Sequence, residues 1–300
     1  SNAGSGEQLK FSDRLSWIVL GWRRSMGADN ATGSGKIDDP RGRALDSMLK
    51  RFVPLAGRLF GNLNLLAALC GTDKYGAHDY TPVYQELMSP RRRQPVRLLE
   101  IGVGGFESEA GGGSLLMWAA YFPKGKVYGI DFHDKTALSR GRIEVLQCSQ
   151  TDAAGLTRIG ERCGPFDFII DDGSHVNSEQ VASFRVLWPF VKDRGTYIIA
   201  DIQTSYWPAF GGGHPGSSDH AHSCMSYFKG MTASVNAPEW LEPACAAPRL
   251  DPTIGSVAFP HNLIVITKNA AVRRSNLPLE NEALRRKLMD PRALQMSGPR

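Results

Sequence analysis

From Val96 onward the chain alternates short apolar segments of strand length with stretches of helical character. Five of these segments, 96–101, 126–131, 143–147, 166–171 and 195–201, are expected to be strands. Two more, 256–259 and 263–267, are expected to form a terminal antiparallel pair. Strands that alternate with helices form a mostly parallel sheet covered on both faces. The sequence therefore predicts an α/β, Rossmann-like fold with a mostly parallel seven-stranded sheet and a C-terminal antiparallel strand.

The segment before this alternating region has a different character. Residues 1–3 read Ser-Asn-Ala, which is typical of an expression scar. Apolar residues recur at helical spacing over 11–26 and again over 44–69, with a stretch rich in Gly, Asp and Ser between them. Residues 1–70 are therefore expected to form an N-terminal helical appendage.

The main domain is expected to span residues 71–270, and residues 271–300 are expected to form a basic tail. Seven Lys or Arg residues and three acids lie between 273 and 300. A nucleic-acid-binding face usually interleaves basic and aromatic residues, and no aromatic residue follows Phe259. We interpret the tail as a solvated charged segment, and nucleic acid is not an expected partner.

Two other classes of protein are not expected. No apolar run approaches the ~20 residues that a membrane span needs, and no secretory leader pattern is seen, so the protein is expected in the cytoplasm. The five cysteines are scattered and include no Cys-x-x-Cys. This pattern argues against a disulfide framework and against a thiolate zinc site.

The first strand ends in an acid and a glycine-rich turn, Glu100-Ile-Gly-Val-Gly-Gly105. Gly102, Gly104 and Gly105 let the backbone approach a ligand closely, although a plain strand–helix turn is the alternative. A dinucleotide fingerprint needs a third glycine at position 107, where Glu107 stands, and no phosphate-loop Gly-Lys-Ser/Thr follows. Carboxylates repel a diphosphate but tolerate a sulfonium cation. The turn therefore predicts S-adenosylmethionine as the cofactor, rather than NAD.

Further polar residues at strand ends complete the predicted cofactor site. Asp131 ends the second strand and is expected to accept hydrogen bonds from ribose hydroxyls, with a turn or capping acid as the alternative. The polar segment after the third strand suits an adenine edge, and there Gln150 and Asp152 are expected to bind the cofactor. Ser114, expected to cap the following helix, and Asp171 are the last members of the predicted set.

A second polar motif, Asp171-Asp-Gly-Ser-His175, follows the fourth strand, and Asp201 ends the fifth. Because these strand ends are neighbours in such a sheet, Asp172 and Asp201 are expected to converge on one Mg²⁺ ion. His175 is expected to act as the general base toward an acceptor hydroxyl whose pKa the metal lowers. The alternative is that Asp172 and Ser174 only cap the next helix.

The segment 211–222 is rich in glycine and histidine. We interpret it as a mobile lid over the substrate. A metal cluster that includes His220 and His222 is the alternative interpretation.

Several stretches carry a family resemblance: Gly71–Lys74 with His78, Tyr80 and Tyr84; Leu98–Gly105; Gly112–Leu115 with Trp118; Phe122-Pro123; Tyr128–Asp131 with Asp134 and Lys135; Gln150–Asp152; Ile170–His175; Thr204–Tyr206; and Gly211–Gly213. Over residues 70–268 the chain resembles the actinobacterial sugar O-methyltransferases of macrolide biosynthesis, typified by the mycinamicin and tylosin deoxysugar enzymes, and related rhamnosyl O-methyltransferases. The resemblance implies a class I methyltransferase fold. It also implies Mg²⁺ held by Asp172 and by a Glu-Asp pair ending at Asp201, with His175 as the proposed base.

The chain departs from that family at two positions. Ala200 stands where the family has the Glu of the pair, and Gln203 stands where relatives usually carry His. Because one expected ligand is missing, Mg²⁺ dependence is expected to be weaker than in relatives. The family's oligomers imply a homo-oligomer that associates through the N-terminal region.

The expected function is S-adenosylmethionine-dependent O-methylation of a sugar hydroxyl on a glycosylated natural product or glycolipid, as in antibiotic biosynthesis. One alternative is a phenolic or catechol O-methyltransferase whose acceptor packs against Tyr206, Trp207 and Phe210. The other is a catalytically degenerate cofactor-binding protein, which the loss of the acid at Ala200 keeps open.

Overall fold

The computed structural model describes residues 11–25, 40–105, 111–241, 251–271 and 274–290. Strands in these ranges form one seven-stranded sheet with the order β3-β2-β1-β4-β5-β7-β6. The first five strands run parallel to one another, and β7 is antiparallel to both of its neighbours. The predicted fold class is confirmed. The strand bounds are β1 (Arg97–Ile101), β2 (Lys126–Asp131), β3 (Ile143–Gln147), β4 (Phe166–Asp171), β5 (Val191–Ala200), β6 (Ile254–Ala258) and β7 (Leu263–Lys268).

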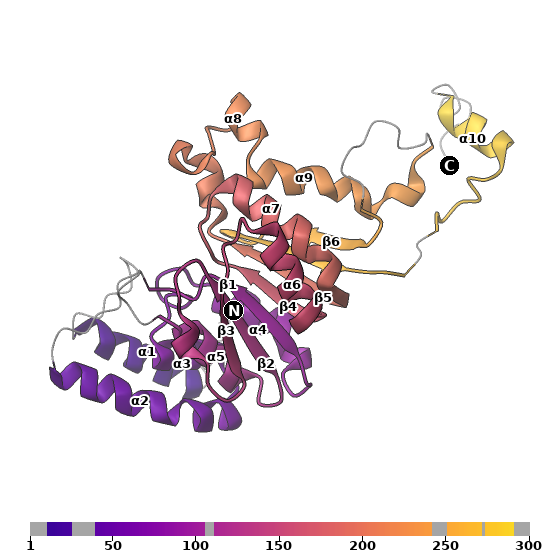
Figure 1. Ribbon diagram of the computed structural model, residues 1–300. Coiled ribbons are helices and arrows are strands. Elements are labelled where there is room, and N and C mark those ends of the chain that lie inside the picture. Colours follow the sequence, from indigo (N-terminus) through magenta and orange to yellow (C-terminus); the bar gives the residue numbers. More distant parts are fainter. Residues whose placement is uncertain (1–10, 26–39, 106–110, 242–250, 272–273, 291–300) are drawn as a thin grey trace, which may run out of the picture.

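Helices cover both faces of this sheet (Figure 1). The α-helices are α1 (Phe11–Ser25), α2 (Pro40–Leu59), α3 (Leu63–Cys70), α4 (Thr81–Met88), α5 (Gly113–Tyr121), α6 (Ala153–Cys163), α7 (Asn177–Leu187), α8 (Ser218–Ala221), α9 (Cys224–Val235) and α10 (Glu282–Met289). The short 3-10 helices are η2 (Ser89–Arg91), η3 (Thr136–Leu138), η4 (Trp188–Phe190), η5 (Ile202–Tyr206), η6 (Pro208–Phe210) and η7 (Ala237–Glu239).

Alternation along each strand divides the apolar core into two layers. In β5, Ile198 and Ala200 face the layer that contains α3, α4 and α5. Tyr197 and Ile199 face the opposite layer, which contains α6, α7 and α9. Both faces of the sheet are thus buried, and the carboxyl ends of the parallel strands are left as the edge where polar residues gather.

The N-terminal helices pack onto the first of these layers. Here α1 contacts α3, while α2 contacts both α3 and α5. The buried Arg23 of α1 pairs with Asp46 of α2 and donates to the carbonyl of Leu69 at 3.0 Å. The core of this face therefore runs continuously from α1 through α3 to the sheet.

The helix expected over 44–69 is interrupted, so this expectation was wrong in one respect. Gly61 has a φ of +55°, and Asn62 caps α3 by accepting a hydrogen bond from Leu65 N at 2.9 Å. A left-handed glycine followed by a capping Asn ends one helix and begins another. The stretch rich in Gly, Asp and Ser that was expected between the two helices, residues 27–40, lies almost entirely outside the described residues.

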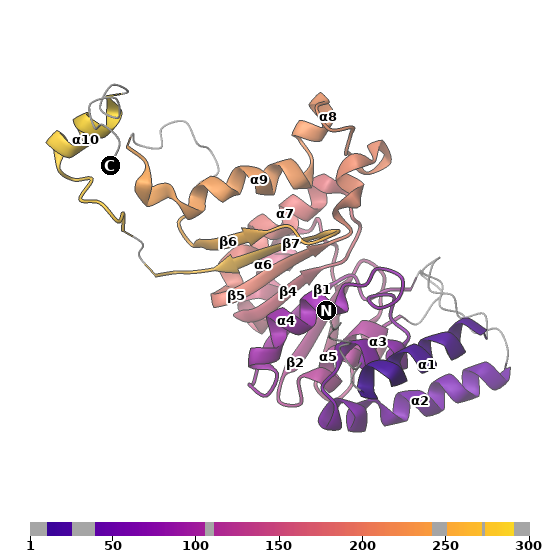
Figure 2. The ribbon, with the colours of Figure 1, turned by 180° about the vertical axis from the view of Figure 1, so that it is seen from behind.

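At the other end of the chain, α10 stands apart from the sheet in both views (Figures 1 and 2). None of its residues is buried. No helix in the described ranges is both long and apolar enough to cross a membrane.

A candidate active site at the carboxyl ends of the strands

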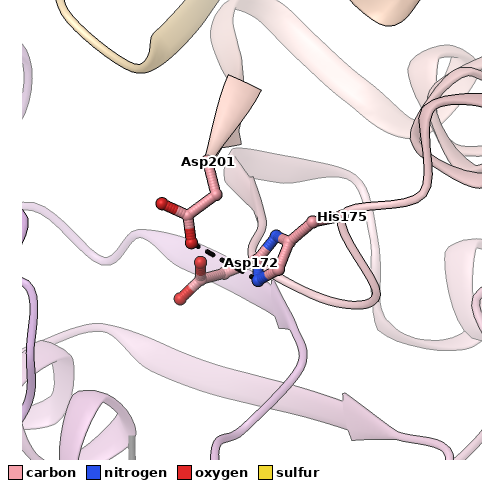
Figure 3. A group of neighbouring side chains, drawn as sticks. All are labelled: Asp172, His175 and Asp201. Atoms are coloured by element: carbon pink, nitrogen blue, oxygen red, sulfur yellow. Dashed lines mark ion pairs between the residues drawn. The ribbon is translucent and has the colours of Figure 1, made fainter. Parts of the chain in front are cut away.

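Three side chains from the ends of β4 and β5 point toward one another (Figure 3). Asp172 and His175 follow β4, and Asp201 follows β5. One ligand atom from each lies within 4.8 Å of the other two. His175 Nε2 is 3.3 Å from Asp201 Oδ2. The structure thus brings together the three residues that the sequence placed in the metal and base roles.

The backbone at this site is held in an uncommon conformation. His175 has a φ of 58° and Asp201 a φ of 56°, although neither is glycine. Such left-handed residues cost free energy, and they cluster at functional sites. In addition, His175 Nδ1 is buried and has no hydrogen-bond partner. Both observations point to a loop shaped for a function rather than for stability.

Asp201 is surrounded by donors from a segment just after α3. The hydroxyl of Tyr80 donates to Asp201 Oδ1, and His78 Nδ1 lies 3.4 Å from the same oxygen. Gln203 Nε2 donates to it at 3.2 Å. In the sequence analysis, His78 and Tyr80 are among the residues that match the family, but no role is predicted for them. Nothing in the local sequence reveals that they meet Asp201.

Asp172 is paired with a buried lysine that sequence reasoning also missed. Lys74 Nζ forms an ion pair with Asp172 Oδ2 and lies 3.2 Å from Glu100 Oε1. Burial lowers the pKa of Lys74, but Asp172 and Glu100 outweigh burial and hold this pKa well above its usual value. Burial likewise raises the pKa of Asp172, but Lys74 and His175 outweigh it and hold this pKa below its usual value. Lys74 and Asp172 are therefore a charged pair.

At the end of β1, the glycine turn packs against the loop after β4. Gly102 has a φ of +80°, and a Cβ there would lie 2.3 Å from the carbonyl oxygen of Asp172. Gly104 has a φ of +73°, and none of the described residues lies within 4 Å of the position that its Cβ would take. The close approach at Gly102 is thus to the chain itself, while among the described residues nothing covers Gly104. Gly105 also has a positive φ of 76°. Glu107 lies outside the described residues.

The acids of this turn are held by neighbouring donors. Asp131 Oδ2 accepts a hydrogen bond from Val103 N at 3.0 Å, and its Oδ1 accepts one from His133 N at 2.9 Å. Ser114 Oγ donates to Glu100 Oε2 at 2.7 Å. The expectation that Ser114 caps its helix was wrong, because Gly112 is the N-cap of α5 and Ser114 lies inside the helix.

The other predicted cofactor residues have partners within the protein. Asp152 caps α6 by accepting from Gly155 N at 2.9 Å. Gln150 donates to Asp171 Oδ1 at 3.0 Å and accepts from Ser174 N at 2.9 Å. Asp171 is fully buried, and burial raises its pKa to about 6. Gln150 and Asp171 therefore brace the loop that carries His175.

The capping alternative for the loop after β4 does not explain Asp172. The N-cap of α7 is Val176, which makes no side-chain capping bond. Ser174 Oγ accepts weakly from Val176 N at 3.3 Å and donates to Glu179 at 2.6 Å, so it supports the helix start locally. Asp172 faces Lys74 instead.

The histidines of the segment 211–222 do not form a metal group. His220 Nδ1 contacts the carbonyl of Ser205 at 3.2 Å, and His222 Nδ1 contacts the carbonyl of Ser218 at 2.8 Å. Within the described part of the chain, Asp172, His175 and Asp201 are the one group with ligand atoms close enough for an ion. The alternative metal cluster is not supported.

The donor set of this group fits a hard divalent cation. It offers two carboxylates and one imidazole, and oxygen ligands suit Mg²⁺. The group carries one negative charge fewer than a site with three carboxylates, because the buried apolar residue Ala200 stands at the position of the missing acid. The turn at the end of β1 fits a cationic nucleoside, since Asp131 is positioned by two backbone amides and none of the described residues covers Gly104.

Comparison with known proteins finds relatives that are named as sugar O-methyltransferases. No family model matches the chain. It is 41% identical over 211 residues to 8-demethyl-8-(2-methoxy-α-L-rhamnosyl)-tetracenomycin-C 3'-O-methyltransferase of Streptomyces olivaceus, a match covering 69% of this chain and 54% of the relative. It is 48% identical over 153 residues to mycinamicin VI 2''-O-methyltransferase of Micromonospora griseorubida, covering 50% and 38%.

A solved structure shows the same relationship. The MycE methyltransferase of the mycinamicin pathway, in complex with Mg and SAH, matches with a TM-score of 0.66 and 38% identity. That match covers 69% of this chain and 54% of the solved one. The chain therefore spans about half the length of the relatives it matches.

Proposed function

Because this chain is homologous to the macrolide and tetracenomycin sugar O-methyltransferases of actinobacteria, at 37–48% identity, we propose that it is a sugar O-methyltransferase itself. It would transfer the methyl group of S-adenosylmethionine to a sugar hydroxyl of a glycosylated natural product or glycolipid. One observation carries the proposal: Asp172, His175 and Asp201 converge next to an acid-and-glycine turn that fits a cationic nucleoside.

Each side of the site has a distinct role in this proposal. The glycine turn, with Glu100 and Asp131, binds the cofactor, and Gly104 allows its close approach. Gln150 and Asp171 hold the loop after β4 in place from behind. Asp152, which caps α6 at the same edge, is retained as an adenine-side contact.

His175 removes the proton from the acceptor hydroxyl. Its Nε2 is the ring nitrogen that faces Asp201, so we assign the proton-transfer role to Nε2. Asp201, 3.3 Å from Nε2, stabilises the imidazolium that forms when the proton arrives. The hydroxyl oxygen, once deprotonated, attacks the methyl carbon, the bond from this carbon to the sulfonium sulfur breaks, and S-adenosylhomocysteine leaves.

A divalent cation such as Mg²⁺ would be held by Asp172 and Asp201, with His175 beside it. When bound, it lowers the pKa of the acceptor hydroxyl. Since Ala200 contributes no charge, this aid is expected to be smaller than in a site with three carboxylates.

A methyl-transfer assay tests the proposal. The protein is incubated with S-adenosylmethionine and a panel of deoxysugar glycosides, with and without Mg²⁺, and products are detected by mass spectrometry. We expect a single added methyl group on at least one glycoside. Methylation confined to catechols would favour the phenolic alternative, and cofactor binding without any transfer would favour a degenerate binding protein.

We also propose that the protein works in the cytoplasm and as a homo-oligomer. The apolar side chains exposed on α1 and α2 support self-association: Phe11, Trp17, Ile18, Met48, Phe52, Leu55 and Leu59 are each at least 46% exposed. Large exposed apolar patches mark interaction surfaces. Sedimentation velocity tests this, and a monomer at all concentrations would contradict it.

The division at residues 70 and 270 stays part of this proposal. Residues 71–270 hold every residue assigned to chemistry here, and the preceding helices would serve packing and association. Because α3 belongs to the same core cluster as the sheet, limited proteolysis decides the boundary: a stable fragment of residues 71–270 would support it, and protection of α3 together with the sheet would move the boundary before α3.

A further inference from the structure

Lys74 has an unusual position for a lysine. It follows α3, its side chain is 2% exposed, and it extends between the end of β1 and the loop after β4. Its ammonium pairs with Asp172 and lies 3.2 Å from Glu100. Lysine is almost never fully buried without partners of opposite charge. The two acids therefore explain why Lys74 lies inside the protein, and they place a fixed positive charge within the site.

The ammonium of Lys74 contacts a carboxylate oxygen of Asp172, a residue that is also assigned to the divalent cation. Lys74 contacts Oδ2 of Asp172, and Asp172 is one of two carboxylates in the cation group. Two cations on one carboxylate repel each other, and burial strengthens that repulsion because the effective dielectric constant is lower than in water. A metal ion must therefore bind against the charge of Lys74 or displace it from Asp172.

Glu100 offsets part of the charge of Lys74, but within the cation group itself Asp201 is the one other carboxylate. Asp201 already accepts hydrogen bonds from Tyr80 and Gln203. Ala200, fully buried in the apolar layer, contributes no carboxylate. Of the acids that face the proposed ion, only Asp201 is free of a lysine partner.

We propose that Lys74 is the resident cation of this site, and that its ammonium competes with a divalent metal ion for Asp172. The inference rests on the cation site of the proposed function. In the absence of metal, Lys74 neutralises Asp172 and keeps the loop after β4 against the glycine turn. A lysine that only oriented Asp172 for the metal would have the opposite effect on metal affinity, so the sign of that effect decides between the two roles.

The test is Mn²⁺ binding to the full chain, measured from the free-ion signal by electron paramagnetic resonance. Lys74→Met removes the charge and keeps much of the length of the side chain. We expect it to tighten Mn²⁺ binding by about tenfold or more, since a repelling charge is removed. Lys74→Gln, which keeps a donor for both acids, is measured in parallel in case the apolar variant fails to fold. The same direction of change is expected.

Lys192→Met is the matched control. Lys192 pairs with Asp167 at 2.7 Å, near the opposite end of β4. This variant also loses a lysine–aspartate pair, but it should leave Mn²⁺ affinity unchanged. Thermal unfolding gives a second readout: Mn²⁺ should restore the stability lost in Lys74→Met, but not that lost in Lys192→Met.

Unchanged or weaker Mn²⁺ binding in both Lys74 variants would overturn the inference and leave Lys74 as a purely structural or orienting residue. A further variant, Asp201→Asn in the Lys74→Met background, distinguishes a wrong inference about Lys74 from a wrong assignment of the cation site. If Mn²⁺ binding in Lys74→Met does not depend on Asp201, the proposed cation site is itself wrong.

Discussion

The two halves of the site are built in different ways. At the ends of β1 and β2, Asp131 accepts hydrogen bonds from two backbone amides and Glu100 accepts one from Ser114, although Glu100 also lies 3.2 Å from Lys74 Nζ. At the ends of β4 and β5, the acids are held by side chains from a distant segment. Lys74 is 98 residues from Asp172, and Tyr80 is 121 residues from Asp201.

This difference implies that a substitution can impair catalysis without impairing cofactor binding, and the reverse. The cofactor half depends mainly on the backbone of the turns after β1 and β2, since Val103 N and His133 N both donate to Asp131. The catalytic half depends on the segment after α3 packing correctly, and on two residues held in left-handed conformations. Substitutions should therefore impair one half while sparing the other, and the following predictions test that separation.

The largest effect is expected from His175→Ala. General-base contributions are typically ~10²–10⁴-fold, so turnover should fall by about that factor. Affinity for S-adenosylhomocysteine, measured by calorimetry, should barely move, because His175 contacts none of the groups assigned to the cofactor. Near-normal turnover would remove His175 from the base role, and the base would then be sought at His214, His220 or His222.

A smaller effect, in the other half, is expected from Asp131→Ala. Loss of charge-assisted hydrogen bonds to the cofactor should weaken binding of S-adenosylhomocysteine by ~1–3 kcal/mol. Mn²⁺ affinity should stay the same, since Asp131 is not in the cation group. Calorimetry with NAD is the control for ligand class. Tight NAD binding with no response to S-adenosylhomocysteine would contradict the cofactor assignment.

Ala200→Glu should strengthen metal binding in the catalytic half. A third carboxylate adds negative charge beside Asp201, and Mg²⁺ binding should tighten by roughly tenfold. The wild-type protein titrated under the same conditions is the reference. Because Ala200 is buried in the apolar layer, thermal unfolding of the variant is measured as well, and an unchanged metal titration in a folded variant would mean that position 200 does not reach the group of Asp172 and Asp201.

The smallest effect is expected from Tyr80→Phe. The variant removes the hydroxyl that donates to Asp201 but keeps the buried ring, so unfolding free energy should fall by about 1 kcal/mol. Binding of S-adenosylhomocysteine should be unaffected. Weakened cofactor binding in this variant would show that the two halves are coupled after all.

The contrast between the halves also explains what could be predicted from the sequence. The second, third and fourth strands have the bounds expected from their apolar runs, and each ends at the predicted polar residue. The fifth strand begins at Val191 rather than at 195. Its early residues Lys192 to Arg194 are all polar, so they hide the alternation of apolar and polar residues that marks a strand. Acids at strand ends are a local signal, so the sequence placed Asp131, Asp172 and Asp201 at one edge.

The parts that sequence reasoning missed depend on tertiary packing. Lys74 and Tyr80 reach the site only because α3 and α4 pack on the layer that contains Ala200. No spacing rule relates residues so far apart. Ser114 was assigned to a cap from its residue type, but the left-handed Gly112 is the N-cap, two residues earlier, and Ser114 donates to Glu100 from inside the helix.

The most direct test of the central claim follows the methyl group to its acceptor atom. The protein is given S-adenosylmethionine labelled with ¹³C in the methyl group, together with a deoxysugar glycoside and its free aglycone, and the product is analysed by NMR. We expect a ¹³C methyl signal correlated with a sugar carbon, absent from the aglycone and lost in His175→Ala. A labelled methyl group on the aglycone, or equal labelling by His175→Ala, would contradict the proposed O-methylation of a sugar.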